Sequence, residues 1–312
     1  MKEVVVIMMW PFAGHHNCAF AFAEVLRKKY EIIFVGVKQG ERSILKQGYQ
    51  YKTLELNHLL NIATNLQSSL RYFFNKKILT QKFQFESNTL LAQLKGLKPS
   101  IIFIDAFLTS HFPLFKSLRI RVVVLQTMLN TRRGKNVPPL SSSFLPSTSF
   151  ASVYYINFLW TIHLFKKKLK KKLLKSYVDY FSMRLATYDK KDYCIELTFH
   201  PGLNNITEVI LSSYAFDFPW RQSQPHQIYF GPAIANQRFE DIPDDYIRFY
   251  NHFKSTKTID SKLIYCSLGS IPKEHNSDFR SFILKINNLA KRNPSWSFIV
   301  STGGKNLSVE DR

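Results

Sequence analysis

Short apolar runs alternate with longer helical stretches along the first part of the chain, and this alternation limits the possible folds more than any other feature. The first run, Val4 to Met9, precedes a helix expected over Ala19 to Lys29 and a second strand over Ile32 to Val37. Strands that alternate with helices favour βα units and a mostly parallel sheet. The sequence therefore predicts an α/β fold whose strands end at one common edge.

A candidate reactive side chain follows the first strand. The segment Pro11 to Asn17 contains Gly14 and His15, and it precedes the expected helix. A strand, a glycine turn and a helix present a side chain at the carboxyl edge of the sheet, where open α/β folds bind ligands. An imidazole with an unperturbed pKa of about 6.5 can accept a proton at cellular pH. His15 is thus a candidate base, and a helix cap or a polar filler is its alternative role.

A carboxylate ends another buried strand. Asp105 follows the run Ile101 to Ile104, ahead of a helix expected near Ser110 to Ser117. Because the carboxyl ends of parallel strands meet at one edge, we expect His15 and Asp105 to be neighbours. Asp is also common just before helices, so a helix cap or a buried ion pair stays open for Asp105.

The rest of the chain holds a proline-rich loop, a long helix and a second βα cycle. The loop Thr131 to Ser149 has paired prolines, which predict an extended segment on the protein surface. A helical stretch from Ala151 to Glu196 should follow. The later expected elements are a third strand at Tyr51 to Leu56, a long helix over Leu66 to Leu97 with at most one break, strands at Val122 to Gln126, Val209 to Ser213, Leu263 to Cys266 and Ser297 to Ser301, and helices at Asp244 to Phe253 and Asp278 to Lys291. The last strands either extend the first sheet or begin a second domain.

The charge and the cysteine content limit the possible functions of the chain. The 43 Lys and Arg against 22 Asp and Glu give a net charge of +21, which suits nucleic acid, an anionic membrane or acidic substrates. The lysines are spread along the whole chain and no nucleic-acid recognition motif accompanies them, so no nucleic-acid partner is predicted. Cys18, Cys194 and Cys266 are too far apart for a C-x-x-C motif. We expect no disulfide framework, no metal site and a reduced, cytoplasmic setting.

One segment raises the question of membrane contact. The uncharged, aromatic run Phe150 to Phe165 leads directly into the lysine-rich run Lys166 to Lys172. A transmembrane span needs about 20 predominantly apolar residues, so spanning is not expected. Peripheral contact with the inner face of the cell membrane is one interpretation. The favoured one is a helix whose apolar side packs inward and whose lysines face water.

Five segments in order resemble landmarks of nucleotide-sugar glycosyltransferases of the two-Rossmann-domain (GT-B) class, especially the bacterial macrolide and natural-product branch. They are Pro11 to His15, Asp105, Val137 to Leu140, Tyr229 to Pro232 and Ile264 to Ser270. The resemblance implies an N-terminal acceptor-binding domain over 1–225, a linker over 226–262, and the first βαβ part of a C-terminal nucleotide-sugar domain over 263–312. The family inverts the anomeric centre of a UDP- or TDP-hexose without a metal or a cofactor.

The resemblance also implies individual roles. His15 would take the proton from an acceptor hydroxyl and Asp105 would orient its imidazole, with His16 as the competing base. The implied donor-binding residues are Gly14, Ser267, Gly269 and Ser270. The implied acceptor-binding residues are Phe12, His16, Phe107, Gln126 and Met128, with Trp10 and the Pro138-Pro139 loop beside them. Such a lining suits an apolar polyketide, terpenoid, phenolic or lipid alcohol.

The sequence departs from this family near its end. The family's most diagnostic segment, rich in His and Gly and ending in an acidic residue, should follow well after Thr302 to Gly304, and eight residues remain there. We therefore expect an incomplete donor domain and very slow or absent transfer by this chain. The alternative function is a non-catalytic protein that keeps an acceptor pocket or a membrane-surface contact without the donor site.

Overall fold

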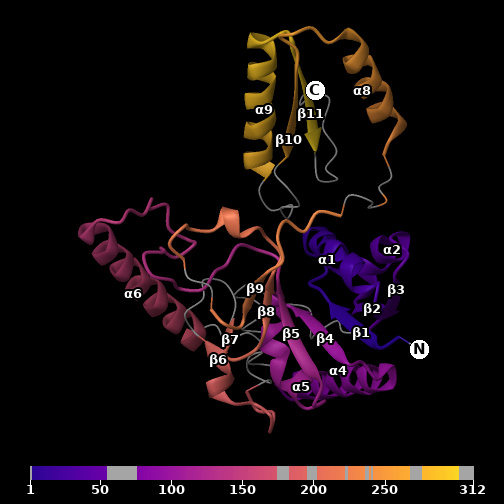
Figure 1. Cartoon of the computed structure of the whole chain (residues 1–312), viewed down its shortest axis with the longest axis vertical. Helices are drawn as coiled ribbons and strands as arrows, with labels where there is room; N and C mark the ends of the chain where they lie inside the picture. Colours follow the sequence, from indigo (N-terminus) through magenta and orange to yellow (C-terminus); the bar gives the residue numbers. More distant parts are fainter. Residues whose placement is uncertain are drawn as a thin grey trace. The chain divides into compact units, whose positions relative to one another are not determined.

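The structure is a computed structural model of the chain and is described at residues 2–54, 76–173, 183–194, 202–221, 224–235, 239, 242–267 and 276–301. It divides into two compact units, Met1–Arg238 (unit 1) and Phe239–Arg312 (unit 2). Figure 1 shows the elements of each unit.

Unit 1 is built on a parallel sheet with the strand order β3-β2-β1-β4-β5-β8-β9 among the described residues. These strands are β1 (Val4–Met8), β2 (Glu31–Gly36), β3 (Gln50–Thr53), β4 (Ile101–Asp105), β5 (Arg121–Gln126), β8 (Glu208–Ile210) and β9 (Gln227–Tyr229). The strand order reverses between β1 and β4, which makes their carboxyl ends the topological switch point of the sheet. The predicted parallel α/β fold is confirmed, with strand boundaries within a few residues of those expected.

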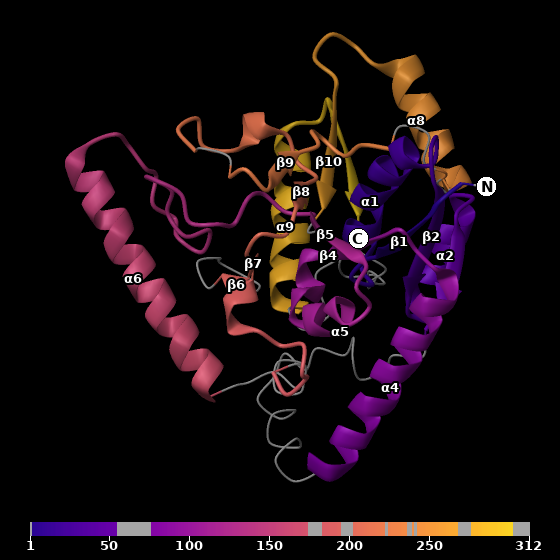
Figure 2. The same ribbon diagram turned by 60° about the horizontal axis from the view of Figure 1, so that its bottom comes forward.

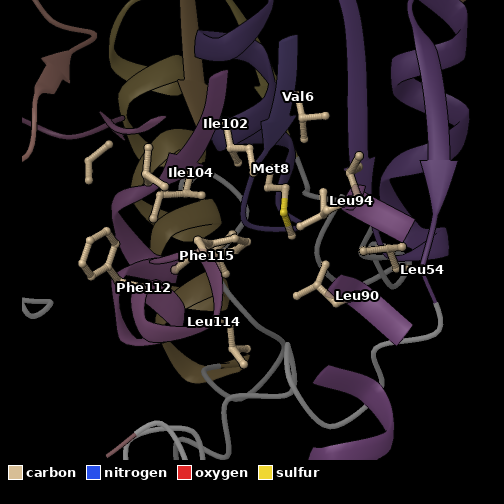
Figure 3. Packing of buried hydrophobic residues seen from close by; sticks show 14 of the residues in the cluster. Val6, Met8, Leu54, Leu90, Leu94, Ile102, Ile104, Phe112, Leu114 and Phe115 are labelled. Carbon is tan, nitrogen blue, oxygen red and sulfur yellow. The ribbon is translucent and has the colours of Figure 1, made fainter. Parts of the chain in front are cut away.

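Helices cover both faces of this sheet, which is why the central strands are almost continuously apolar. The described helices are α1 (Ala13–Leu26), α2 (Lys38–Lys46), α4 (Lys76–Leu97), η1 (Ala106–His111), α5 (Phe112–Lys116), α6 (Phe150–Leu173), η2 (Lys190–Asp192) and η3 (Tyr214–Phe216). Side chains alternate along each strand, so Val6 and Met8 face one core cluster while Val5 and Ile7 face the other. Figure 3 shows the first cluster, in which Leu90 and Leu94 of α4 lie over the sheet.

Helix α1 begins at Ala13 and not at Ala19, so His15 lies in its first turn and not in a turn before it. Phe12 has an extended backbone (φ −112°, ψ 142°) and is the N-cap residue, without a side-chain capping bond. Its carbonyl accepts the backbone N–H of His15 at 3.0 Å and of His16 at 3.2 Å. The helix is thereby fixed directly behind the short connection that follows β1.

The proline loop and the helix after it also differ from expectation. Pro138 and Pro139 are buried, because α6 packs against this part of the loop, whereas residues 140–149 are half-buried or exposed as expected. Trp160 of α6 is 1% exposed, and its indole N–H donates to the carbonyl of Val137 at 2.7 Å. Helix α6 is described as far as Leu173, and residues 183–194 form turns, η2 and β6 (Tyr193–Cys194), which pairs with β7 (Gly202–Leu203). The expected continuous helix to Glu196 was wrong over that part.

Unit 2 contains α8 (Asp244–Thr256), β10 (Lys262–Ser267), α9 (Asn276–Arg292) and β11 (Trp296–Ser301). Strands β10 and β11 pair in parallel, from Lys262 opposite Trp296 to Ser267 opposite Ser301. Of the two alternatives, these strands form a separate sheet and do not extend the first. The segment 226–262, expected as a linker, supplies β9 to the sheet of unit 1 and contains α8. The boundaries 1–225 and 263–312 stay a prediction.

Among the residues that the structure describes, no helix has the length and apolar character needed to cross a bilayer.

The packing of α6 on the proline loop predicts a difference between two tryptophans. Trp160→Phe leaves the buried carbonyl of Val137 without its donor, which should cost about 1–3 kcal/mol of unfolding free energy. Trp220 also donates to a carbonyl, that of Asn136 at 3.0 Å, but it is only partly buried, so water can replace the bond in Trp220→Phe. Urea unfolding followed by circular dichroism should show the larger loss for Trp160→Phe, and equal losses would contradict this account.

Candidate active site

The switch point of the sheet brings together the two side chains that the sequence singled out. His15 lies in the first turn of α1, directly after β1, and Asp105 is the last residue of the neighbouring strand β4. The Nδ1 atom of His15 lies 2.6 Å from Oδ2 of Asp105. The expectation that these residues are neighbours is confirmed, because both follow adjacent parallel strands.

The Asp105 carboxylate is fully buried and accepts hydrogen bonds from three places. Its Oδ1 accepts the backbone N–H of Phe107 at 2.9 Å, and its Oδ2 accepts the backbone N–H of Trp10 at 3.2 Å in addition to His15. The bond from Phe107 is the cap of η1. The helix cap that was left open for Asp105 and the contact with His15 therefore occur together.

The contact with Asp105 fixes which nitrogen of His15 is available. A carboxylate only accepts hydrogen bonds, so the neutral imidazole places its hydrogen on Nδ1 and leaves a lone pair on Nε2. The hydroxyl oxygen of Thr127 also lies 3.1 Å from Nδ1. The His15 side chain is 16% exposed, so it is held by buried partners but reaches the surface. This arrangement suits a base that acts through Nε2.

Thr127 was missed by sequence reasoning, which named its neighbours Gln126 and Met128. It directly follows β5, the strand next to β4 in the sheet. Its place at the end of a third adjacent strand was the available signal, because all three strands end at the same edge.

Aromatic rings surround His15. The Phe107 ring packs edge-on against the imidazole with centroids 5.1 Å apart, and the Phe12 centroid lies 6.4 Å away. Trp10 lies 6.3 Å from both of these phenyl rings. Phe12 is 45% exposed, so part of this apolar surface faces outward beside the histidine. The structure thus gathers Trp10, Phe12 and Phe107 of the expected acceptor site around the candidate base.

Other expected acceptor residues lie differently. Gln126 is fully buried, and its side-chain amide is 3.4 Å from the hydroxyl of Thr131. Met128 is partly exposed. His16 is buried against α2, where a Cβ atom on Gly40 would come within 2.6 Å of the His16 Cε1 atom. A role of Gln126, Met128 or His16 in acceptor binding stays a prediction.

The environment of His16 separates it from His15. Burial lowers the pKa of His16 to about 4, with a further lowering by the charge of His15 and a partial offset by Asp105. His16 is therefore neutral at cellular pH, but only 5% of it is exposed. An acceptor hydroxyl has far better access to His15, which favours His15 over its neighbour as the base.

The expected donor residues fall in both units and are described separately. Gly14 is exposed in the first turn of α1, and a Cβ atom there would meet nothing within 4 Å. Ser267 is the exposed last residue of β10, while Gly269 and Ser270 lie outside the described residues. The described part of the chain has no group of three or more His, Cys, Asp or Glu side chains placed to hold a metal ion.

No protein-family model matches this chain, and no curated protein matches it. Among solved structures, the glycotransferase of kitacinnamycin superposes with a TM-score of 0.53 at 12% identity, over 99% of this chain and 68% of that one. The glycosyltransferase SnogD from Streptomyces nogalater gives a TM-score of 0.49 at 10% identity, over 99% and 68%. The spinosyn rhamnosyltransferase SpnG gives 0.48 at 12% identity, over 96% and 65%.

The first of these superpositions shows the fold. This chain has a GT-B-like α/β architecture, with a Rossmann-like domain followed by a βαβ unit of a second one, and it resembles natural-product glycosyltransferases. The fold class predicted from the sequence is confirmed.

The buried state of His16 predicts a pH dependence of stability. In the unfolded chain His16 takes up a proton near pH 6.5, whereas in the folded chain it does so only near pH 4. Its contribution to stability is therefore complete above pH 6.5 and is lost as the pH falls toward 4. Between pH 7 and pH 4.5 the wild-type chain should lose about 2 kcal/mol more than His16→Gln, which cannot titrate.

Urea unfolding followed by tryptophan fluorescence measures this difference. A Trp296→Phe background removes the signal of unit 2, since the other tryptophans, Trp10, Trp160 and Trp220, lie in unit 1. The same pH dependence in the His16→Gln chain and its parent would show that His16 is not held neutral by burial.

Proposed function

We propose that this chain takes part in sugar transfer from a UDP- or TDP-hexose to a hydroxyl of an apolar small-molecule or lipid acceptor, with inversion at the anomeric carbon. The observation that carries the proposal is the His15–Asp105 pair at the switch point of the sheet, 2.6 Å apart and flanked by aromatic rings. Ligands of open α/β folds bind at such switch points. The GT-B-like fold supports the same reaction class.

The chemistry follows from the free nitrogen of His15. Its Nε2 lone pair takes the proton of the acceptor hydroxyl while the hydroxyl oxygen forms a bond to the anomeric carbon. The bond from that carbon to the diphosphate oxygen breaks, and the nucleoside diphosphate leaves with the electron pair. Attack from the face opposite the leaving group inverts the anomeric centre. Asp105 keeps the imidazole oriented and stabilises the imidazolium that forms.

The acceptor side of this reaction lies within unit 1. Phe12 and Phe107 pack beside the imidazole of His15 and Trp10 packs beside both of them, so an apolar surface adjoins the candidate base. Such a lining suits an apolar alcohol, which gains binding free energy from burial while its hydroxyl meets the base. Thr127 contacts the same ring nitrogen as Asp105 and helps to hold the imidazole.

The donor side is proposed for the segment that follows β10 in the sequence. Ser267 ends that strand, and Gly269 and Ser270 precede α9 in the sequence. Backbone amides and hydroxyls at the start of a helix suit a diphosphate. Gly14 is proposed as a further donor-binding residue. It carries no side chain, so the donor can approach the backbone closely at the start of α1. Neither a metal nor a further cofactor has a part in this scheme.

A reducing cytoplasm is proposed as the compartment. Cys18, Cys194 and Cys266 form no disulfide with one another. Oxidising compartments favour disulfides, which this chain does not form between its described cysteines.

The test is a transfer assay in which the protein is incubated with UDP- and TDP-hexoses and a panel of apolar alcohols. Products are measured by mass spectrometry. His15→Ala should lower kcat by about 10²- to 10⁴-fold, the usual contribution of a general base. Asp105→Asn should cause a smaller but clear loss of kcat. The imidazole stays in place, but the carboxylate that accepts its Nδ1 hydrogen is gone.

The matched control is His252→Ala, which removes an exposed histidine from α8. It should transfer sugar at the wild-type rate. Wild-type turnover in His15→Ala would contradict the mechanism. Binding of apolar alcohols to a protein that transfers no sugar from any donor would favour the non-catalytic alternative.

A further inference from the structure

Helix α6 has two opposite faces that differ in their contacts. Its inner face is buried and carries Ser152, Ile156 and Trp160, each four residues from the next. The opposite face carries a row of exposed aromatic side chains, here called the α6 stripe: Phe150, Tyr154, Phe158 and Phe165, which are 84%, 73%, 54% and 67% exposed. Figures 1 and 2 both show α6 at the margin of unit 1, away from the sheet. The helix is therefore anchored on one side and apolar on the other.

A stripe of this kind is unusual on a water-facing helix. A surface helix normally directs its apolar side to the core and its polar side to water. The inner face of α6 already packs against the proline loop, where Trp160 donates a hydrogen bond to Val137. The stripe therefore adds apolar surface that the packing of unit 1 does not need. Exposed aromatic rows of this size mark contact sites.

The charge around the stripe has one sign. Between Asp105 and Asp179 the sequence contains no acidic residue and thirteen lysines and arginines. Lys116 forms an ion pair with Asp192 and Arg132 forms one with Glu208, both acids from later in the chain. Lys166 and Lys168 are exposed at the end of the stripe, and Lys168 lies eighteen residues, or five turns, from Phe150 on the same line of the helix.

A groove lies beside α6 on the same unit. It has a volume of about 700 Å³ and is bordered by the proline loop and the helix. Its lining includes Ser141, Ser142 and Ser143 together with Tyr155 and Lys166. Hydroxyl donors next to an ammonium group suit a phosphate, and the aromatic wall suits an adjoining apolar chain.

We propose that α6 docks on the surface of an anionic lipid bilayer. The α6 stripe lies along one line of a helix about 36 Å long, and a straight apolar row fits a flat surface. Aromatic side chains beside a lysine cluster suit the boundary between headgroups and acyl chains. Lys166 and Lys168 then meet anionic headgroups, and the groove receives a lipid phosphate. This docking does not depend on sugar transfer.

The alternatives fit less well. A nucleic acid would satisfy the lysines but would leave the α6 stripe in water. A second copy of this chain would bring two basic surfaces together, which costs free energy. A bilayer with acidic lipids satisfies both the aromatic and the basic side chains at once.

Vesicle sedimentation tests the docking directly. The full chain is mixed with vesicles of phosphatidylcholine and phosphatidylglycerol (3:1) or of phosphatidylcholine alone. Binding should be at least tenfold stronger to the anionic vesicles. It should fall steeply between 0.1 M and 1 M salt, over which the Debye length shortens from about 10 to about 3 Å. Each basic residue near such a surface contributes a factor of about five, so Lys166→Gln/Lys168→Gln should weaken binding roughly 25-fold.

A second variant removes the apolar contact and leaves the charge. Phe158→Ser/Phe165→Ser should weaken binding at least tenfold at every salt concentration. Two matched controls should bind like the wild type: Phe85→Ser/Phe216→Ser removes rings elsewhere on unit 1 that are at least as exposed, and Lys28→Gln/Lys29→Gln removes the same charge from another part of its surface.

Three outcomes would overturn the proposal. The first is equal binding to both kinds of vesicle, or none. The second is an equal loss of binding in the α6 variants and their controls, which would indicate a diffuse charge effect. The third is a dimer, seen by sedimentation velocity without vesicles, that Phe158→Ser/Phe165→Ser dissociates while vesicle binding is unchanged. The stripe would then be an interface between copies of this chain.

Discussion

Three elements of unit 1 meet at the carboxylate of Asp105. The connection after β1 donates through the backbone of Trp10, η1 donates through the backbone of Phe107, and α1 donates through the side chain of His15. A fully buried carboxylate is stable only when such donors replace the lost water. The hydrogen bonds that offset the cost of burying the Asp105 carboxylate also fix the start of α1 and the orientation of the His15 ring. The orientation of the candidate base is therefore a product of the fold, and no separate loop has to close to create it.

A second buried polar cluster holds the segment that follows β5. Arg132 pairs with Glu208 of β8 at 3.0 Å, and the buried Arg221 donates to the carbonyls of Arg132 and Asn130. Gln227 of β9 joins the cluster by donating to Glu208 at 2.9 Å. These bonds tie the segment to the last two strands of the sheet. The segment begins just after Thr127, so the cluster also steadies the hydroxyl that contacts His15.

The sequence was sufficient where local pattern decides structure. Apolar runs located the central strands, and the rule that parallel strands end at one edge predicted that His15 and Asp105 are neighbours. Prediction failed where contacts between residues far apart in the sequence decide the structure. Pro138 and Pro139 are buried because Trp160, more than twenty residues later, packs on their loop and donates to Val137. The early start of α1 was missed because its N-cap residue, Phe12, carries none of the usual capping side chains. Thr127 was missed because a threonine after a strand is too common to stand out.

The central claim is that Asp105 holds the hydrogen of His15 on Nδ1 and leaves Nε2 free as a base. Long-range ¹H–¹⁵N correlation spectra of the ¹⁵N-labelled chain at pH 7.5 measure this directly, with His15→Gln to assign the signals. We expect a protonated Nδ1 and an unprotonated Nε2 in the wild type, and a loss of this preference in Asp105→Asn. A hydrogen on Nε2, or two tautomers in rapid exchange in the wild type, would contradict the account.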